Sequence, residues 1–167
     1  MSASVIRLAV SAVTLGFAAS LATPAGADLL AHKDLSLDTA LTIASTAAAT
    51  CKDRGFRVSV HVVGRNGEVI VALRGDNAAP HTMENSMRKA YTARTFRVPS
   101  GEIVKRVKEN PQFAGVFLTN VIATEGALPI KVGEDVIGAV GVSGAPGGDK
   151  DAACAQTGID KVADQLK

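Results

Sequence analysis

The sequence is poor in aromatic residues: it has no tryptophan, one tyrosine and five phenylalanines among 167 residues. A platform for stacking nucleic-acid bases needs several exposed rings, so this scarcity argues against that class of protein. Neither sign of charge dominates, with 18 basic and 16 acidic residues and a formal net charge of +2. This balance leaves no basic footprint for a nucleic acid or an anionic membrane. We therefore expect no nucleic-acid partner.

Metal-binding and catalytic motifs are also missing. No two of the three histidines, His32, His61 and His81, are four residues apart, and no C-x-x-C pattern occurs. Glu84 lies three residues after His81, but a single carboxylate at a helix start is ordinary. A structural zinc site or a di-iron site is therefore not expected. No Ser-His-Asp or Cys-His constellation can be assembled with any specificity. An enzymatic role is left open, and a protein without its own turnover is the favoured interpretation.

The one long apolar run, "LAVSAVTLGFAASLA" at residues 8–22, lies near the start of the chain. It follows a single positive charge, Arg7, and precedes an A-x-A pattern at residues 25–27. This arrangement predicts a secretory signal peptide over residues 1–27 and hence a periplasmic or secreted protein. A retained membrane anchor is the alternative, although the run is shorter than the roughly 20 residues that a spanning helix needs. After cleavage we expect no membrane span.

The remaining chain divides into a mature N-terminal segment, residues 28–34, and one domain, residues 35–167. Its periodicity predicts a helix from Leu37, two strands joined at Asn66-Gly67, a helix capped by Thr82, a short helix from Ser100, a second hairpin and a last helix. Residues 116–124 fit either a buried turn or a short strand. Hairpins imply an antiparallel sheet, so the fold class is α+β.

The only two cysteines, Cys51 and Cys154, suggest one disulfide in an exported chain, and two unrelated buried thiols are the alternative. If the first and last strands are antiparallel neighbours, the end of the first helix and the start of the last helix lie at the same edge of the sheet. A bridge there would close a loop of roughly 100 residues, stabilising the fold by up to about 4–5 kcal/mol in the chain-entropy model.

Two stretches resemble a known family: "RGDNAAPHTMENSMRKAYTARTF" (residues 74–96) and "ALPIKVGEDVIGAVGVSGAPGGDKDAACAQTGI" (residues 127–159). They are similar to the GlcG/HbpS-like haem-binding ("haem-degrading") domain family, to which the C-terminal domain of PduO-type adenosyltransferases also belongs. The resemblance runs from about Leu35 to the end. It implies a profilin-like α/β/α three-layer fold with a five-stranded antiparallel sheet in the order 2-1-5-4-3, and assembly into dimers or larger homo-oligomers.

The resemblance makes haem the expected cofactor, with another tetrapyrrole or a corrinoid as the alternative. Haem needs an apolar slot, an axial donor and cations for its propionates. His81, where a loop becomes a helix, is the predicted axial ligand to the metal, and Arg88 and Lys89 are the predicted propionate partners. The family does not share one axial residue, so Thr82 is the alternative donor. On the residues alone, His81 also fits an ordinary hydrogen-bonding loop position.

Two other features receive plainer interpretations. His61 falls on the polar side of the first strand, which predicts a position at the surface or in an interface. The glycine-rich "GVSGAPGGD" (residues 141–149) fits neither a P-loop nor a dinucleotide fingerprint. Its N–H groups are suited to a carboxylate or phosphate at the start of the last helix. A tight loop that needs positive φ is the favoured alternative.

Three functions therefore remain at this point. The first is an extracytoplasmic haem- or tetrapyrrole-binding protein, in which no residue points to haem degradation. The second is an enzyme or carrier for short hydroxy- or oxo-acids. The third is a scaffold or sensor accessory protein whose oligomer surface is the function.

Overall fold

The computed structural model describes residues 29–167, so the predicted signal peptide at residues 1–27 lies outside the described part. Residues 32–167 form one compact unit, and residues 29–31 contain neither helix nor strand. None of the described helices is both long enough and apolar enough to cross a membrane. In chain order the elements are α1 (Leu37–Asp53), β1 (Ser59–Val63), β2 (Val69–Arg74), α2 (His81–Phe96), α3 (Ser100–Glu109), η1 (Pro111–Val116), β3 (Ala127–Val132), β4 (Asp135–Ser143), α4 (Gly148–Lys161) and η2 (Ala163–Gln165).

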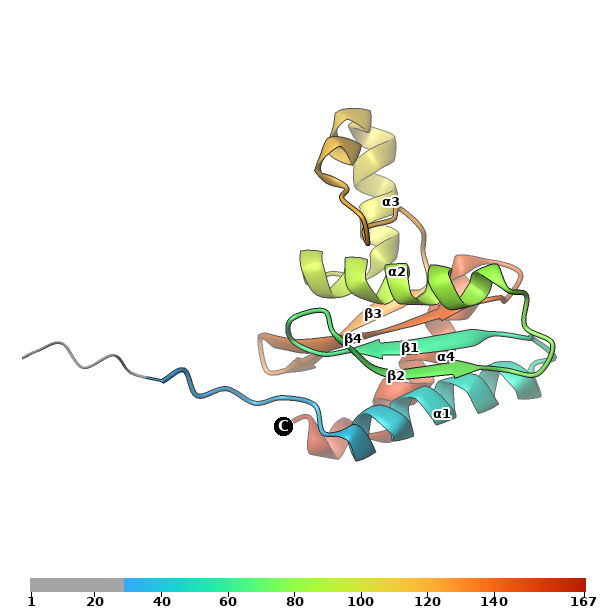
Figure 1. Ribbon diagram of the computed structural model, residues 1–167, viewed down its shortest axis with the longest axis vertical. Coiled ribbons are helices and arrows are strands. Elements are labelled where there is room, and N and C mark those ends of the chain that lie inside the picture. The colour runs from blue at the N-terminus through green and yellow to red at the C-terminus, as the bar shows by residue number, and fades with distance from the viewer. Residues whose placement is uncertain (1–28) are drawn as a thin grey trace, which may run out of the picture. The chain divides into compact units, whose positions relative to one another are not determined.

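One antiparallel sheet organises the domain, with the strand order β2-β1-β4-β3 among the described residues. The helices α1 and α4 pack together on one face of this sheet, and α2 covers the other face (Figure 1). The short helices α3 and η1 stand away from the sheet beyond α2 (Figure 1). The predicted α+β class and the three-layer arrangement are confirmed.

The five-stranded sheet implied by the resemblance is wrong by one strand. The missing strand is the ambiguous segment at residues 116–124, which is turn and coil after η1. The backbone N–H of Ile122 donates to the hydroxyl of Thr92 on α2 at 2.9 Å. This segment therefore bonds to a helix side chain instead of adding to the edge of β3. Without that strand the implied order 2-1-5-4-3 becomes the observed order.

The first helix begins and ends where local chemistry predicts. The side chain of Ser36 accepts a hydrogen bond from the N–H of Thr39 at 3.1 Å, which satisfies one of the unpaired donors at the start of α1. Gly55 follows the helix with a φ of +79°, a conformation that glycine adopts without steric cost. Between them Ile43, Ala44 and Ala47 are fully buried against the sheet and α4.

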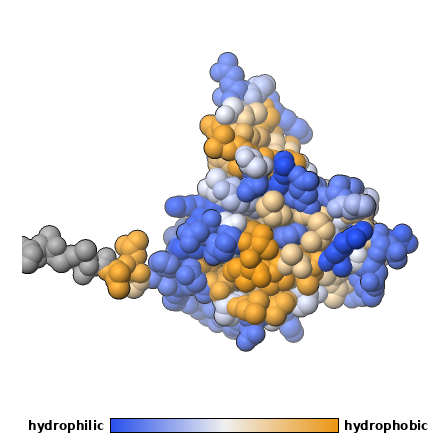
Figure 2. Space-filling model, in the orientation of Figure 1, coloured by the Kyte–Doolittle hydropathy of each residue, from blue (hydrophilic) through white to orange (hydrophobic). Residues whose placement is uncertain are grey.

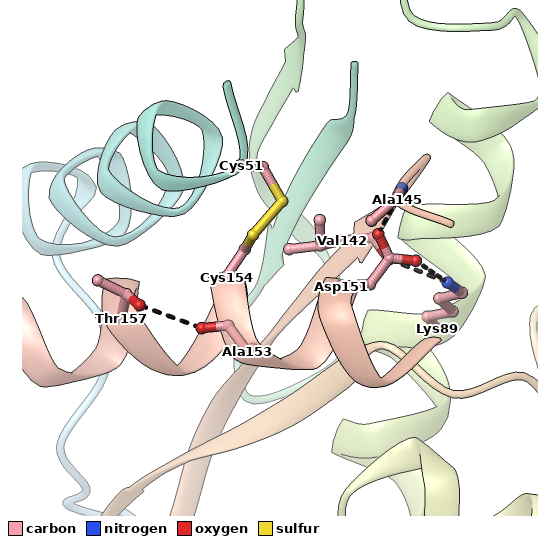
Figure 3. The surroundings of a disulfide bond; sticks show 8 residues. All are labelled: Cys51, Lys89, Val142, Ala145, Asp151, Ala153, Cys154 and Thr157. Atoms are coloured by element: carbon pink, nitrogen blue, oxygen red, sulfur yellow. Dashed lines mark hydrogen bonds and ion pairs between the residues drawn. A yellow bond between two sulfur atoms is a disulfide. The ribbon is translucent and has the colours of Figure 1, made fainter. Parts of the chain in front are cut away.

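A disulfide ties the two helices on this face together. Cys51 of α1 and Cys154 of α4 are bonded and completely buried, with 5.7 Å between their Cα atoms (Figure 3). The pairing of β1 with β4 brings the two helix ends to the same edge of the sheet. The predicted bridge is therefore confirmed, together with the strand adjacency on which it depended.

The strand β1 is buried on both faces, which corrects the prediction for His61. Its five residues are all buried, since α1 and α4 cover one face of the sheet and α2 covers the other. His61 is on the face expected from alternation but is only 6% exposed, so a surface position is wrong. Its Nδ1 lies 2.8 Å from the hydroxyl of Ser86 on α2.

Within the compact unit, residues 32–167, apolar side chains reach the surface in two regions (Figure 2). On the face formed by β2 and α1, Leu37, Leu41 and Val69 are exposed. In the α3–η1 region, Val116 and Leu118 are exposed beside a cluster of phenylalanine rings whose centroids lie 5.6–6.4 Å apart. Exposed apolar groups of this kind are common at protein–protein interfaces.

Candidate functional site

A cleft with a volume of 480 Å³ opens beside the first turns of α2. Its walls come from α2, the end of β4, the glycine-rich loop that leads into α4, and the segment before β3. We call it the α2–α4 cleft. Most of its side chains are polar or charged, including His81, Asn85, Lys89, Glu125 and Asp151. The volume lies within the range of about 300–1,000 Å³ typical of small-molecule sites.

His81 lies at the edge of this cleft and also borders a second hollow. The second hollow, of 340 Å³, is lined by Glu84, Arg88 and Ile122, and it shares His81 and Asn85 with the first. The His81 side chain is exposed and makes no hydrogen bond or ion pair with any residue from 29 to 167. The imidazole of His81, the first residue of α2, therefore borders both hollows and is not hydrogen-bonded to any of the described residues.

Thr82 does not have its predicted capping role. The helix begins two residues earlier than expected, after Pro80, and no side chain caps its first turn. Thr82 is buried, with 1% of the residue exposed. Its hydroxyl donates to the carbonyl of Ala79 at 2.7 Å and lies 2.7 Å from the hydroxyl of Ser59. Thr82 lines the cleft, but its oxygen is already engaged within the protein.

Lys89 lies beneath the cleft instead of on an open face of the helix. It is 2% exposed, and its Nζ donates to Oδ2 of Asp151 at 2.8 Å and to the carbonyl of Val142 at 3.1 Å (Figure 3). Burial raises the pKa of the Asp151 carboxyl, and the neighbouring ammonium opposes that rise. The role of Lys89 as a propionate partner stays a prediction, since its charge is already balanced by a carboxylate.

The glycine-rich loop has the plainer of its two predicted roles. The N–H of Ala145 donates to Oδ1 of Asp151 at 3.0 Å (Figure 3). This amide is therefore used by the protein's own side chain. Gly144 and Gly147 have φ values of +130° and +143°, conformations that L residues rarely adopt.

Arg88 lies in the second hollow and is partly exposed. Its Nη2 is 2.7 Å from Oε1 of Glu84, one helical turn earlier, while its Nε is buried without a partner in the described part of the chain. An i,i+4 ion pair at a partly exposed site contributes only a few tenths of a kcal/mol, about 0.3–0.5. A stronger anionic partner can therefore displace Glu84 at little cost.

The remaining histidines are outside the cleft. The buried His61 faces Ser86, and burial lowers its pKa. The exposed His32 pairs with Asp34 at 3.2 Å, near the start of the compact unit. Within residues 29–167 no group of three His, Cys, Asp or Glu side chains is arranged to hold a metal ion.

Three functional side chains escaped the sequence analysis: Arg57, Asn85 and Asp151. Asp151 looked like an ordinary acidic residue of a helix start, and Arg57 like an ordinary polar position at the start of a strand. Asn85 donates to the hydroxyl of Ser143 at 2.9 Å, which holds α2 against the end of β4. These three side chains line one cleft only because separate elements pack together there, so no local sequence pattern identifies them.

The fold and the cleft together define a three-layer α+β domain in which a free histidine at a helix start overlooks a polar cleft. The HbpS-like family model, described as "Haem degrading protein HbpS-like", matches residues 35–160. The chain therefore belongs to the HbpS-like family, as the sequence resemblance indicated.

Individual relatives agree with this assignment. An uncharacterised 15.0 kDa protein from the dhaT-dhaS intergenic region of Citrobacter freundii is 32% identical over 129 residues, which cover 75% of this chain and 90% of that protein. A crystal structure of a double mutant of HbpS from Streptomyces reticuli is 33% identical, has a TM-score of 0.76 and covers 86% of this chain and 97% of its own.

A more distant solved structure extends the fold comparison. The crystal structure of a PduOC–haem complex has a TM-score of 0.71 and is 22% identical, covering 77% of this chain and 95% of its own. At this identity the likeness shows the shared fold alone.

Proposed function

We propose that this chain is an extracytoplasmic, homo-oligomeric protein that binds haem or a related tetrapyrrole, with the imidazole of His81 as its axial ligand. Membership of a haem-related family supports the choice of ligand class. The observation that carries the proposal is the free His81 side chain at the junction of two hollows. Turnover of haem is not part of the proposal, since no residue beside the cleft supplies a specific chemical step.

The shape of the two hollows supports a flat ligand. Because they share His81 and Asn85, the two hollows adjoin at the first turn of α2. A planar macrocycle can lie across both hollows with the imidazole beneath its metal. Ala79, Val104 and Ile122 supply apolar lining, though less than a fully apolar haem slot provides.

The second requirement of haem, cations for its propionates, assigns roles to Arg88 and Lys89. Arg88 is on the rim of the second hollow and can exchange its weak partner Glu84 for a propionate. Lys89 contributes positive charge from beneath the cleft, reduced by its pairing with Asp151. His81 is favoured over Thr82 as the axial donor, because the threonine oxygen is buried and hydrogen-bonded.

Oligomerisation is proposed from the exposed apolar residues on the β2–α1 face and in the α3–η1 region. Burying such residues between copies removes apolar surface from water and stabilises association. The extracytoplasmic location is supported by the predicted signal peptide and by the disulfide between Cys51 and Cys154, since disulfides persist mainly in oxidising compartments.

Titration of the purified protein with hemin tests the proposal. We expect a shifted Soret band in the wild type and a weakening of roughly 30-fold in His81→Ala, the loss that follows removal of a dominant contact of about 2 kcal/mol. His32→Ala is the matched control, because it removes another exposed histidine that lines neither hollow. A wild type without any Soret shift refutes tetrapyrrole binding, and a spectrum unchanged in His81→Ala refutes the assigned ligand.

A second candidate is favoured by the polar lining of the α2–α4 cleft: a short hydroxy- or oxo-acid as the ligand. A charged cleft of this volume suits a small carboxylate as well as the carboxylate edge of a macrocycle. The loop amide of Ala145 does not support it, since Asp151 already accepts its hydrogen bond. Side-chain cations must then provide the recognition.

A further inference from the structure

One cation of the α2–α4 cleft is not used by the rest of the protein. Arg57 lies in the segment before β1 and lines the cleft, and it also borders a separate hollow between the end of α1 and the end of β2. Its side chain is exposed, and it makes no ion pair or side-chain hydrogen bond with the residues that the structure describes. The carbonyl of Arg57 packs against Gly144, so its backbone is fixed next to the glycine-rich loop.

The other cations near the site are already paired. Lys89 is held by Asp151 at 2.8 Å inside the protein. Arg88 is held by Glu84 at 2.7 Å and lines the second hollow, not this cleft. Arg57 is therefore the cation of the α2–α4 cleft that can bind an incoming anion without first losing a partner.

Two helix starts border the same cleft as Arg57. The first residues of α2 and of α4 both line it, and neither helix has a side-chain cap within the described chain. The start of each helix carries a partial positive charge and unpaired N–H groups, which offset part of the negative charge of Glu125 and Asp151 in the lining. An unpaired guanidinium in the same lining can bind a carboxylate through two parallel hydrogen bonds.

We infer that Arg57 anchors a carboxylate of the ligand in the α2–α4 cleft. This inference rests on the proposed function and specifies it: one propionate of a haem bound at His81 extends into this cleft toward Arg57, in addition to the contacts proposed for Arg88 and Lys89. The inference also specifies that the ligand carries an anionic group, because an uncharged ligand gains no ion pair from this side chain. Arg57 acts by positioning the ligand and not by ligating its metal.

The test compares hemin with its dimethyl ester, in which both propionates are uncharged. We expect hemin to bind Arg57→Ala about tenfold more weakly than the wild type, as for loss of a charge-assisted hydrogen bond. Arg57→Lys should retain part of the affinity, and the Soret position should not change, because the axial ligand is intact. The ester should bind the wild type and Arg57→Ala equally. Arg54→Ala is the matched control, since Arg54 is an exposed arginine at the end of α1 that lines neither hollow.

Two results would overturn the inference. If Arg57→Ala binds hemin as tightly as the wild type, Arg57 is not a carboxylate anchor. If it weakens hemin and the ester alike, its role is structural.

A separate titration distinguishes failure of the inference from failure of the proposed function. Succinate is added to the ¹⁵N-labelled protein, and the amide signals of Gly144 and Gly147 are followed by NMR. If the wild type binds no hemin but these signals move in the wild type and not in Arg57→Ala, the haem proposal fails and the carboxylate anchor stands. If neither ligand produces an Arg57-dependent response, the inference is refuted as well.

Discussion

Replacing Asp151 by alanine should destabilise the domain far more than loss of an ordinary ion pair. The two side chains of the Lys89–Asp151 pair are each only 3% exposed, with their charged atoms 2.8 Å apart. The substitution leaves an ammonium buried with the carbonyl of Val142 as its remaining partner, and it also removes the acceptor of the Ala145 N–H. Removing one partner of a buried pair costs about 3–5 kcal/mol. That is a large fraction of a typical total stability of about 5–15 kcal/mol.

Urea denaturation at neutral pH, with the disulfide intact, measures this cost directly. The matched control is Glu102→Ala, which removes an exposed pair with Lys105 of similar length, 2.7 Å. It should cost no more than about 1 kcal/mol, because solvent screens exposed pairs. The double substitution Lys89→Met with Asp151→Leu should recover much of the loss, since apolar replacement of a whole buried pair is often close to neutral.

Equal costs for Asp151→Ala and Glu102→Ala would refute the reasoning. Such a result would mean that water reaches the Lys89 ammonium and that its burial has no energetic consequence. A double variant as unstable as Asp151→Ala would refute a narrower point: it would show that packing, and not an unpaired charge, produces the loss.

Substituting Cys51 and Cys154 together by alanine should lower the free energy of unfolding by up to about 4–5 kcal/mol, because the bridge links residues 103 positions apart. A urea midpoint equal to that of the oxidised wild type would contradict this prediction. Burial lowers the pKa of His61 below 6.5, so its stabilising contribution is complete above that value and is lost as the pH falls toward the lowered pKa. The melting temperature should therefore drop more for the wild type than for His61→Gln between about pH 7 and pH 5. Gly144→Ala should lower the free energy of unfolding by about 1–3 kcal/mol, because it places a Cβ 2.3 Å from a backbone carbonyl oxygen at a residue with positive φ. Gly115→Ala is the control: its Cβ would meet open space, so the change in the same urea assay should stay within about 0.5 kcal/mol.

Local chemistry made several elements of this fold predictable from the sequence. A capping serine at Ser36, a glycine stop at Gly55 and the Asn66-Gly67 turn each act over a few residues. Two hairpins require antiparallel strands, and adjacency of the first and last strands was enough to predict the bridge between Cys51 and Cys154. The position of His81 near a helix start could also be predicted from the sequence, because a loop containing Gly, Asn and Pro precedes it.

The errors have a common physical cause. Alternation along β1 shows which side chains share a face, but not what covers that face. Because α2 covers it, His61 is buried and bonded to Ser86. The same applies to Lys89, which looked like a solvent-facing cation until Asp151 from a distant helix was found beside it.

The sequence by itself determined the α+β class, the family and the histidine at the start of α2, because these depend on short-range patterns and on stretches of residues that resemble a known family. Only the tertiary structure decided which charges of the cleft are engaged and which are available. Asp151 comes from α4, Lys89 from α2 and Arg57 from the segment before β1. Charges interact through space over a few ångströms, so their pairing is fixed by how these three segments pack and not by their positions in the chain.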